Sequence, residues 1–248
     1  MHGGGARYHE YGGTPLGLPN VADGLYAIQQ AVFVQKLCTA QELIDALKAD
    51  FQGWEYLQAT LRAIPKYGIN DPEVDALATR VATDFSDLYL SYKNRWGGTG
   101  KPVILTFVYS PLAAEKLGAT ADGRKAGSSV AHGVTPHSGS MTEGITSAIL
   151  SCAKMPHHKF SGGASTMWDF DSSWASEPLI EAILRSFMQA GGQIFQGNTS
   201  SVDELLRAQQ DPELAQNLIV RVGGYSARFN TLTKELQDEI IARLRHSA

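Results

Sequence analysis

A chain of 248 residues with 43% hydrophobic and 19% charged residues has the composition of a folded globular protein with one large or two small domains. The net charge of −4 argues against a nucleic-acid partner, and no apolar run reaches the length of about 20 residues that a membrane-spanning helix needs. The start has no apolar signal segment and the two cysteines are too few for a disulfide framework, so we expect a cytoplasmic protein.

Helix signals dominate residues 1–95. Apolar residues recur at helical spacing after Asn20, a residue type suited to an N-cap, and Thr39 and Glu42 have the spacing of a capping box. Asp71-Pro72 supplies the N-cap and first residue of a long helix. The helices predicted here begin at Asn20, Thr39, Trp54 and Asp71, and the last three end near Phe51, Ile64 and Tyr92.

Strand and helix patterns alternate after residue 95, which indicates an α/β arrangement with parallel strands. The continuous apolar run 103–109 is typical of a strand covered on both faces. Further strands are predicted at 193–195 and 218–222, helices at 145–153, 178–190, 202–209 and 233–245, and loops at 121–124, 132–144 and 160–174. Three or four strands are too few to close a barrel, so the chain is expected to form part of a larger structure.

Several chemically suggestive residues lack the spacing of a known site. The histidines have no zinc-binding pattern, and no metal is expected. Asp169 and Asp171 could form a carboxylate pair, but a solvated loop is the expectation. Cys38 and Cys152 have no spaced histidine partner, so we expect inert thiols.

The segment 218–232 carries two adjacent glycines after a strand pattern, followed by Tyr225. A left-handed turn is one explanation. A second is chemical, because loss of one α-hydrogen from glycine leaves a carbon radical that the flanking amide and carbonyl delocalise. Only glycine gives an unhindered backbone radical of this kind. Physical arguments alone nevertheless favour the left-handed turn.

The segment Arg221–Phe229 resembles the C-terminal signature R-V-x-G-Y of the glycyl radical enzymes, in which the glycine before the tyrosine carries the radical. The resemblance implies that Gly224 bears the radical, supported by Arg221, Val222, Gly223, Tyr225 and Ser226. Further segments resemble the dehydratase and lyase branch in the same order: residues 4–8, 20–23, 51–53, 65–68, 121–127 and 211–213.

This resemblance implies a fold class: an α/β fold with a helical N-terminal part (1–95), part of a ten-stranded α/β barrel (96–200) and a C-terminal glycyl radical domain (201–248). It also implies an anaerobic bacterial enzyme whose glycyl radical is installed by a radical S-adenosylmethionine activating enzyme. In the family the radical oxidises a catalytic cysteine, and in the dehydratases a nearby glutamate acts as base.

The cysteine and glutamate loop of the family lies upstream of the segment that matches residues 4–8, and neither cysteine of this chain fits it. We therefore expect the chain to be the radical-bearing subunit of a lyase or dehydratase that acts on a small molecule, with a larger subunit supplying both residues. Two alternatives remain: a spare-part protein that restores a damaged pyruvate formate-lyase-like enzyme, and a truncated or cleaved product. Possible pocket residues are Pro136, His137, Trp168 and Phe170.

Overall fold

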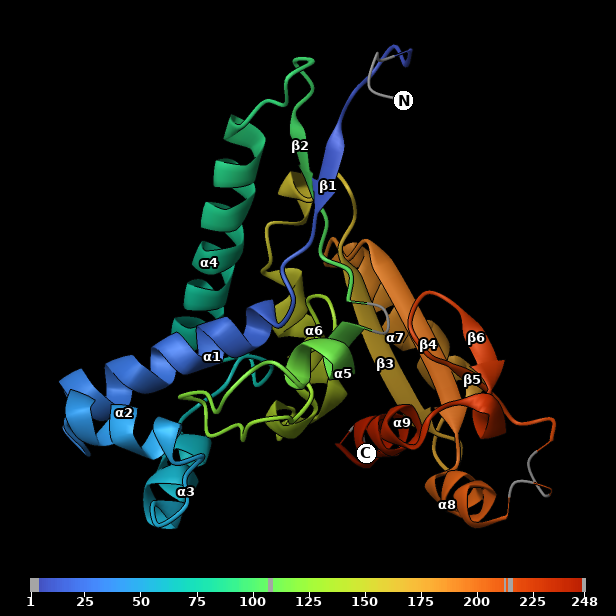
Figure 1. The fold of residues 1–248 in the computed structure, drawn as a ribbon. Helices are drawn as coiled ribbons and strands as arrows, with labels where there is room; N and C mark the ends of the chain where they lie inside the picture. Colours follow the sequence, from blue (N-terminus) through green and yellow to red (C-terminus); the bar gives the residue numbers. More distant parts are fainter. Residues whose placement is uncertain (1–4, 107–108, 212, 214–215, 247–248) are drawn as a thin grey trace.

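The computed structural model describes residues 5–106, 109–211, 213 and 216–246. Figure 1 shows a helical part on one side, a central group of nearly parallel strands, and a C-terminal part against the far side of those strands. Between residues 5 and 91 the elements are β1 (Tyr11–Gly13), α1 (Leu18–Ile28), a π-helix (Gln29–Val34), α2 (Ala40–Lys48), α3 (Glu55–Ala63) and α4 (Pro72–Ser91).

Local capping chemistry sets two of the helix starts as predicted. The Thr39 hydroxyl accepts a hydrogen bond from the Glu42 N–H, and the Glu42 carboxylate accepts one from the Thr39 N–H, which completes the capping box of α2. The Asp71 carboxylate accepts from the N–H groups of Glu73 and Val74 at the start of α4.

The predicted N-cap at Asn20 is wrong. Helix α1 begins two residues earlier, after Gly17 in the left-handed region at φ 71°. The Asn20 side chain is buried and donates to Asp122 at 3.0 Å, while its oxygen accepts from the Ala131 N–H at 2.8 Å. A residue suited to capping thus holds α1 to a loop about 100 positions away.

The second half contains β2 (Gly100–Pro102), α5 (Tyr109–Ala114), α6 (Gly144–Ala153), β3 (Ser165–Asp171), α7 (Glu177–Gln189) and β4 (Ile194–Ser200). The pairs β1–β2 and β3–β4 are both parallel, and a parallel bridge between Ile104 and Ala164 connects them. The structure contains the predicted helix and the strand after it as α7 and β4, and β3 completes a strand–helix–strand unit.

Two predictions in this region are wrong. Residues 103–106 do not form a regular strand and Tyr109 begins α5, while Phe107 and Val108 lie outside the described residues. The Thr14 hydroxyl bonds both the N–H and the carbonyl of Leu105, so a side chain takes the place of a neighbouring strand. Conversely, part of the predicted loop 160–174 is β3, whose first six residues are all buried.

The last elements are α8 (Val202–Gln210), β5 (Ile219–Arg221), β6 (Ser226–Arg228) and α9 (Lys234–His246), with β5 and β6 paired antiparallel. Their apolar side chains form a small core of their own, separate from the main core beneath the helices and β3. Its buried members are Leu205, Ala208, Val220, Phe229, Ile240, Ile241 and Leu244. The domain boundaries given above stay a prediction.

Candidate functional site

The hairpin between β5 and β6 presents Gly224 at its tip. We call residues 221–226 the Gly224 loop. The Val222 N–H donates to the Tyr225 carbonyl at 3.0 Å, which closes the turn, and Gly224 has φ 77°, in the left-handed region that side chains with a Cβ rarely adopt. Val222 and Gly223 are buried, whereas Gly224, Tyr225 and Ser226 are exposed. The described chain therefore holds the stem of the loop and leaves its tip open.

A side chain from the neighbouring strand contacts Gly224 directly. The Gly224 N–H donates to the Gln196 side-chain oxygen at 2.6 Å. Gln196 lies on β4, in parallel register with Met167 of β3, two residues before Asn198. Because side chains alternate along a strand, Gln196 and Asn198 lie on the same face of the β3–β4 pair.

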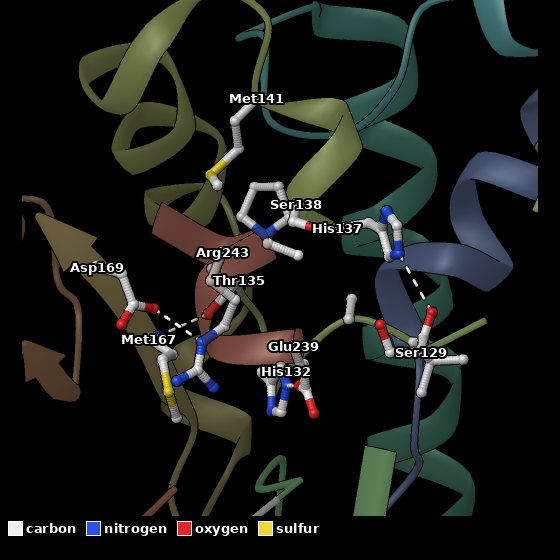
Figure 2. Close-up of a pocket in the computed structure, with 14 residues that line it drawn as sticks. Ser129, His132, Thr135, His137, Ser138, Met141, Met167, Asp169, Glu239 and Arg243 are labelled. Carbon is white, nitrogen blue, oxygen red and sulfur yellow. Dashed lines mark hydrogen bonds and ion pairs between the residues drawn. The ribbon is translucent and has the colours of Figure 1, made fainter. Parts of the chain in front are cut away.

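Arg243 of α9 binds the stem of the same loop. Its two terminal nitrogens donate to the carbonyls of Val222 (3.2 Å) and Arg221 (3.1 Å), and its Nε lies 2.9 Å from Asp169 Oδ2 on β3. Arg243 and Asp169 are only 8% and 1% exposed, so this is a buried ion pair (Figure 2). Asn198 links the two strands to the loop, donating to Asp169 Oδ1 at 3.0 Å and accepting from the Arg221 N–H at 3.4 Å.

A second polar pair joins α9 to the loop after residue 130. His132 Nε2 contacts the Glu239 carboxylate, and both side chains are largely buried (Figure 2). Burial by itself raises the pKa of Glu239, but the hydrogen bond from His132 and the charges of His132 and Arg243 outweigh it, so the pKa lies below its ordinary value. The carboxylate is therefore ionised at neutral pH.

Three cavities of the described part of the chain border these residues. One, drawn in Figure 2, lies among His132, Thr135, Asp169 and Arg243 and has a volume of 30 Å³, room for about one or two water molecules. The second has a volume of 700 Å³ and lies beside Tyr225, between α9 and residues 111–115 and 127–129. A third, of 390 Å³, lies along β4 and β5 beside Gln196, Asn198 and Arg221. The second is the largest of the three, and the second and third are each large enough for a small-molecule substrate.

The four predicted pocket residues separate in the structure. Pro136 and His137 line the small cavity, and their role in substrate binding stays a prediction. Trp168 and Phe170 lie on β3 and not on a loop, and both are 1% exposed in the main core, where their rings pack against Phe195. Alternation along β3 directs these two rings away from the face that carries Asp169.

The expectation of a solvated loop at Asp169 is wrong. Asp169 is buried and paired with Arg243, whereas Asp171 ends β3 and accepts a hydrogen bond from the Ser173 N–H. The two carboxylates have separate structural partners and do not form an acid–base pair.

Both cysteines lie away from the Gly224 loop. Cys152 is fully buried in α6, its thiol donates to the Val134 carbonyl at 3.3 Å, and burial raises its pKa to about 12. Cys38 precedes Thr39, the N-cap of α2, and Figure 1 shows α2 across the molecule from β5 and β6. Burial, and to a smaller extent Glu42, raises the pKa of the Cys38 thiol.

Three residues that contact the Gly224 loop were missed in the sequence: Gln196, Asn198 and Arg243. The sequence signal for the first two was their spacing of two residues, which puts them on one face of any strand that continues beyond 195. Nothing local marks Arg243, because its partners Asp169 and Arg221 are distant in the chain.

Comparison with known proteins shows the family of the chain. Residues 1–110 match the family model described as pyruvate formate lyase-like, and residues 130–230 match the glycine radical model, which includes the whole Gly224 loop. The chain belongs to the glycyl radical enzyme family.

The similar proteins include dehydratases and lyases. The chain is 33% identical to trans-4-hydroxy-L-proline dehydratase of Clostridioides difficile, over 97% of this chain and 31% of the relative. It is 32% identical to isethionate sulfite-lyase of Bilophila wadsworthia, over 93% of this chain and 29% of the relative. The chain thus spans about a third of the length of the curated relatives that it matches.

Solved structures confirm the fold class. The glycerol-bound B12-independent glycerol dehydratase of Clostridium butyricum superposes with a TM-score of 0.92 at 36% identity, over 97% of this chain and 31% of that one. The two parallel pairs and their helices therefore correspond to part of the fold of a glycyl radical enzyme.

Among the described residues, no helix is both long and apolar enough to cross a membrane.

Proposed function

We propose that this chain is the radical-bearing part of a lyase or dehydratase and that Gly224 stores the unpaired electron. The carrying observation is the exposed glycine at the tip of a hairpin, within the region that matches the glycine radical family. Removal of one hydrogen atom from its Cα leaves a radical that the Gly224 N–H and carbonyl delocalise, and a radical S-adenosylmethionine activating enzyme is the expected agent.

A thiol from another polypeptide segment completes the proposed site. In the family this thiol passes the radical to the substrate, and neither Cys38 nor the buried Cys152 is placed beside the Gly224 loop. The 700 Å³ cavity next to Tyr225 offers space for a segment that carries the thiol and for the substrate. We propose a separate larger subunit as its source, together with a glutamate that serves as base.

The substrate is a small molecule that loses a hydrogen atom to the thiyl radical and then breaks a neighbouring bond. The similarity to both dehydratases and a sulfite-lyase supports this general class and does not favour one bond. The helices and parallel strands of residues 11–200 exceed what a spare-part protein that only replaces the radical hairpin needs, which favours the subunit hypothesis.

Electron paramagnetic resonance tests the radical. After anaerobic activation, the chain should give a doublet, split by the one remaining α-hydrogen of Gly224, and Gly224→Ala should give none. Gly191→Ala is the matched control, because Gly191 also has a positive φ (91°) and has open space for a Cβ. That variant has comparable backbone strain and should keep the doublet. A full signal in Gly224→Ala refutes the assignment.

A further inference from the structure

We infer that Gln196 and Arg243 are positioning residues that hold the Gly224 loop on the β3–β4 face, Gln196 at the tip and Arg243 at the stem. This inference deepens the proposed function and depends on it for its catalytic meaning. The contacts themselves are properties of the folded chain before activation.

Arg243 is suited to this role by its geometry. Its planar guanidinium contacts three groups at once: the carbonyls of Arg221 and Val222 and the Asp169 carboxylate. A lysine ammonium is a single point of charge and cannot reproduce this planar array. Because the ion pair is buried, Asp169 offsets the cost of removing the guanidinium from water, and the remaining donors are directed to the loop stem.

Asn198 connects Asp169 to the stem of the Gly224 loop and so completes the hydrogen-bond network around Arg243. The Asp169 carboxylate binds both Arg243 and Asn198, and Asn198 in turn accepts from the Arg221 N–H. Both backbone groups of Arg221 are thereby fixed to side chains of β4 and α9. The stem cannot leave β4 without breaking contacts on two elements.

Gln196 acts at the radical-bearing residue. Its 2.6 Å contact is with the Gly224 N–H, whose nitrogen shares the spin of a Cα radical. A hydrogen bond at this N–H holds the peptide plane and changes the distribution of spin along it. Gln196 therefore sets the orientation of the tip, while the Arg243 network sets its position.

Amide hydrogen exchange of the unactivated protein, in the assembly in which it is isolated, tests the positioning. Arg243→Lys and Gln196→Leu should each speed exchange of residues 219–226 by about tenfold or more, the expected effect of losing a charge-assisted or short hydrogen bond. Arg228→Lys and Gln189→Leu are the matched controls, since both residues are exposed and neither side chain forms a hydrogen bond with the part of the chain that the structure describes. They should leave exchange unchanged.

Two outcomes of the exchange experiment refute the inference. One is a wild-type rate at residues 219–226 in both variants. The other is a uniform increase over residues 201–246, which means that the substitutions loosen the whole C-terminal part and not the loop. Exchange confined to 219–226 supports it.

Electron–nuclear double resonance of the activated protein provides a readout that general destabilisation does not change. Gln196→Leu should keep the doublet but shift the coupling to the Gly224 amide proton, identified by its loss in D2O. An unshifted coupling contradicts the role of Gln196. If the wild type gives no radical while the exchange results hold, the proposed function fails and the loop positioning stands.

Discussion

At the scale of single residues, the candidate site centres on a glycine whose backbone conformation is rare for other residues. Gly224 combines a left-handed φ of 77°, an exposed tip and a hydrogen bond through its N–H. Each property has a separate physical origin. The hairpin turn sets the φ of Gly224, the described residues leave the tip uncovered, and the side chain of Gln196 accepts the hydrogen bond. If Gly224 stores the radical as proposed, the residues around it position the glycine and do not contribute a reactive group of their own.

The cysteines of this chain should be dispensable for turnover. Cys38→Ala and Cys152→Ala are expected to keep turnover per radical unchanged, because neither thiol lies beside the Gly224 loop. Cys152→Ala should lower the free energy of unfolding by about 1 kcal/mol, since its side chain fills part of the main core. Turnover is normalised to the spin count of each sample. Loss of turnover at a full spin count in either variant contradicts the proposal that the thiol comes from elsewhere.

Oxygen should cut the activated chain at one place. Dioxygen adds to a Cα radical, and collapse of the peroxyl breaks the backbone at Gly224, which removes residues 225–248. Mass spectrometry after exposure to air should show this shortened chain only in activated protein. Unactivated protein and Gly224→Ala are the controls, and equal cleavage in either indicates ordinary proteolysis.

At the scale of elements, buried polar side chains join helices to distant loops. Asp23 of α1 accepts from the Tyr67 N–H at 2.7 Å and from the Ser140 hydroxyl at 3.4 Å, and it lies near Lys66. The pKa of Asp23 is raised to about 8, chiefly by burial and to a smaller extent by the charge of Asp122, while the Tyr67 N–H and Lys66 limit the rise. The carboxyl group is therefore protonated over much of the range in which exposed carboxyl groups are ionised.

This shift predicts a pH dependence of stability. A group whose pKa is higher in the folded than in the unfolded state contributes most below the unfolded value of 3.8, and that contribution is lost as the pH rises to about 8. The melting temperature should therefore fall between pH 5 and pH 8, and Asp23→Asn should flatten that fall because its amide does not ionise. Asp45→Asn, at an exposed position of α2, is the control and should keep the wild-type slope. An unchanged slope in Asp23→Asn contradicts the protonation state.

At the scale of the whole molecule, the described chain has a main core and a small C-terminal core, and the tip of the Gly224 loop is exposed. Helix α9 contacts β3 through the ion pair of Arg243 and Asp169, and β5 contacts β4 through the hydrogen bond from the Arg221 N–H to Asn198. Polar contacts thus join the part that holds the small core to the two strands. The Gly224 tip and the 700 Å³ cavity lie on the side that the described residues leave uncovered. If Gly224 carries the radical as proposed, it needs protection from water and oxygen, which is the physical reason to expect a covering polypeptide.

Limited proteolysis tests the cover. Chymotrypsin should cleave the isolated chain after Tyr225, which is 45% exposed, and addition of the larger subunit should slow this cleavage by about tenfold, the effect of burying a site in an interface. Serum albumin at the same concentration is the control for unspecific protection. Equal cleavage with and without the larger subunit contradicts a cover over the Gly224 loop.

Local chemistry in the sequence was sufficient for part of this description. The caps at Thr39 and Asp71 are formed by residues within four positions of each other, and in the structure both side chains keep these local partners. The segment Arg221–Phe229 likewise carries its family resemblance in nine consecutive residues, and the comparisons confirm the family.

Only the tertiary structure decided the rest, because the deciding contacts join residues far apart in the chain. Asn20 could cap a helix, but buried partners at Asp122 and Ala131 take its side chain. Residues 165–171 have no simple strand alternation because both faces are covered, one by the aromatic core and the other by α9. Arg243 has no local signal at all: its role exists only because folding brings Asp169 and the stem of the Gly224 loop to the same guanidinium.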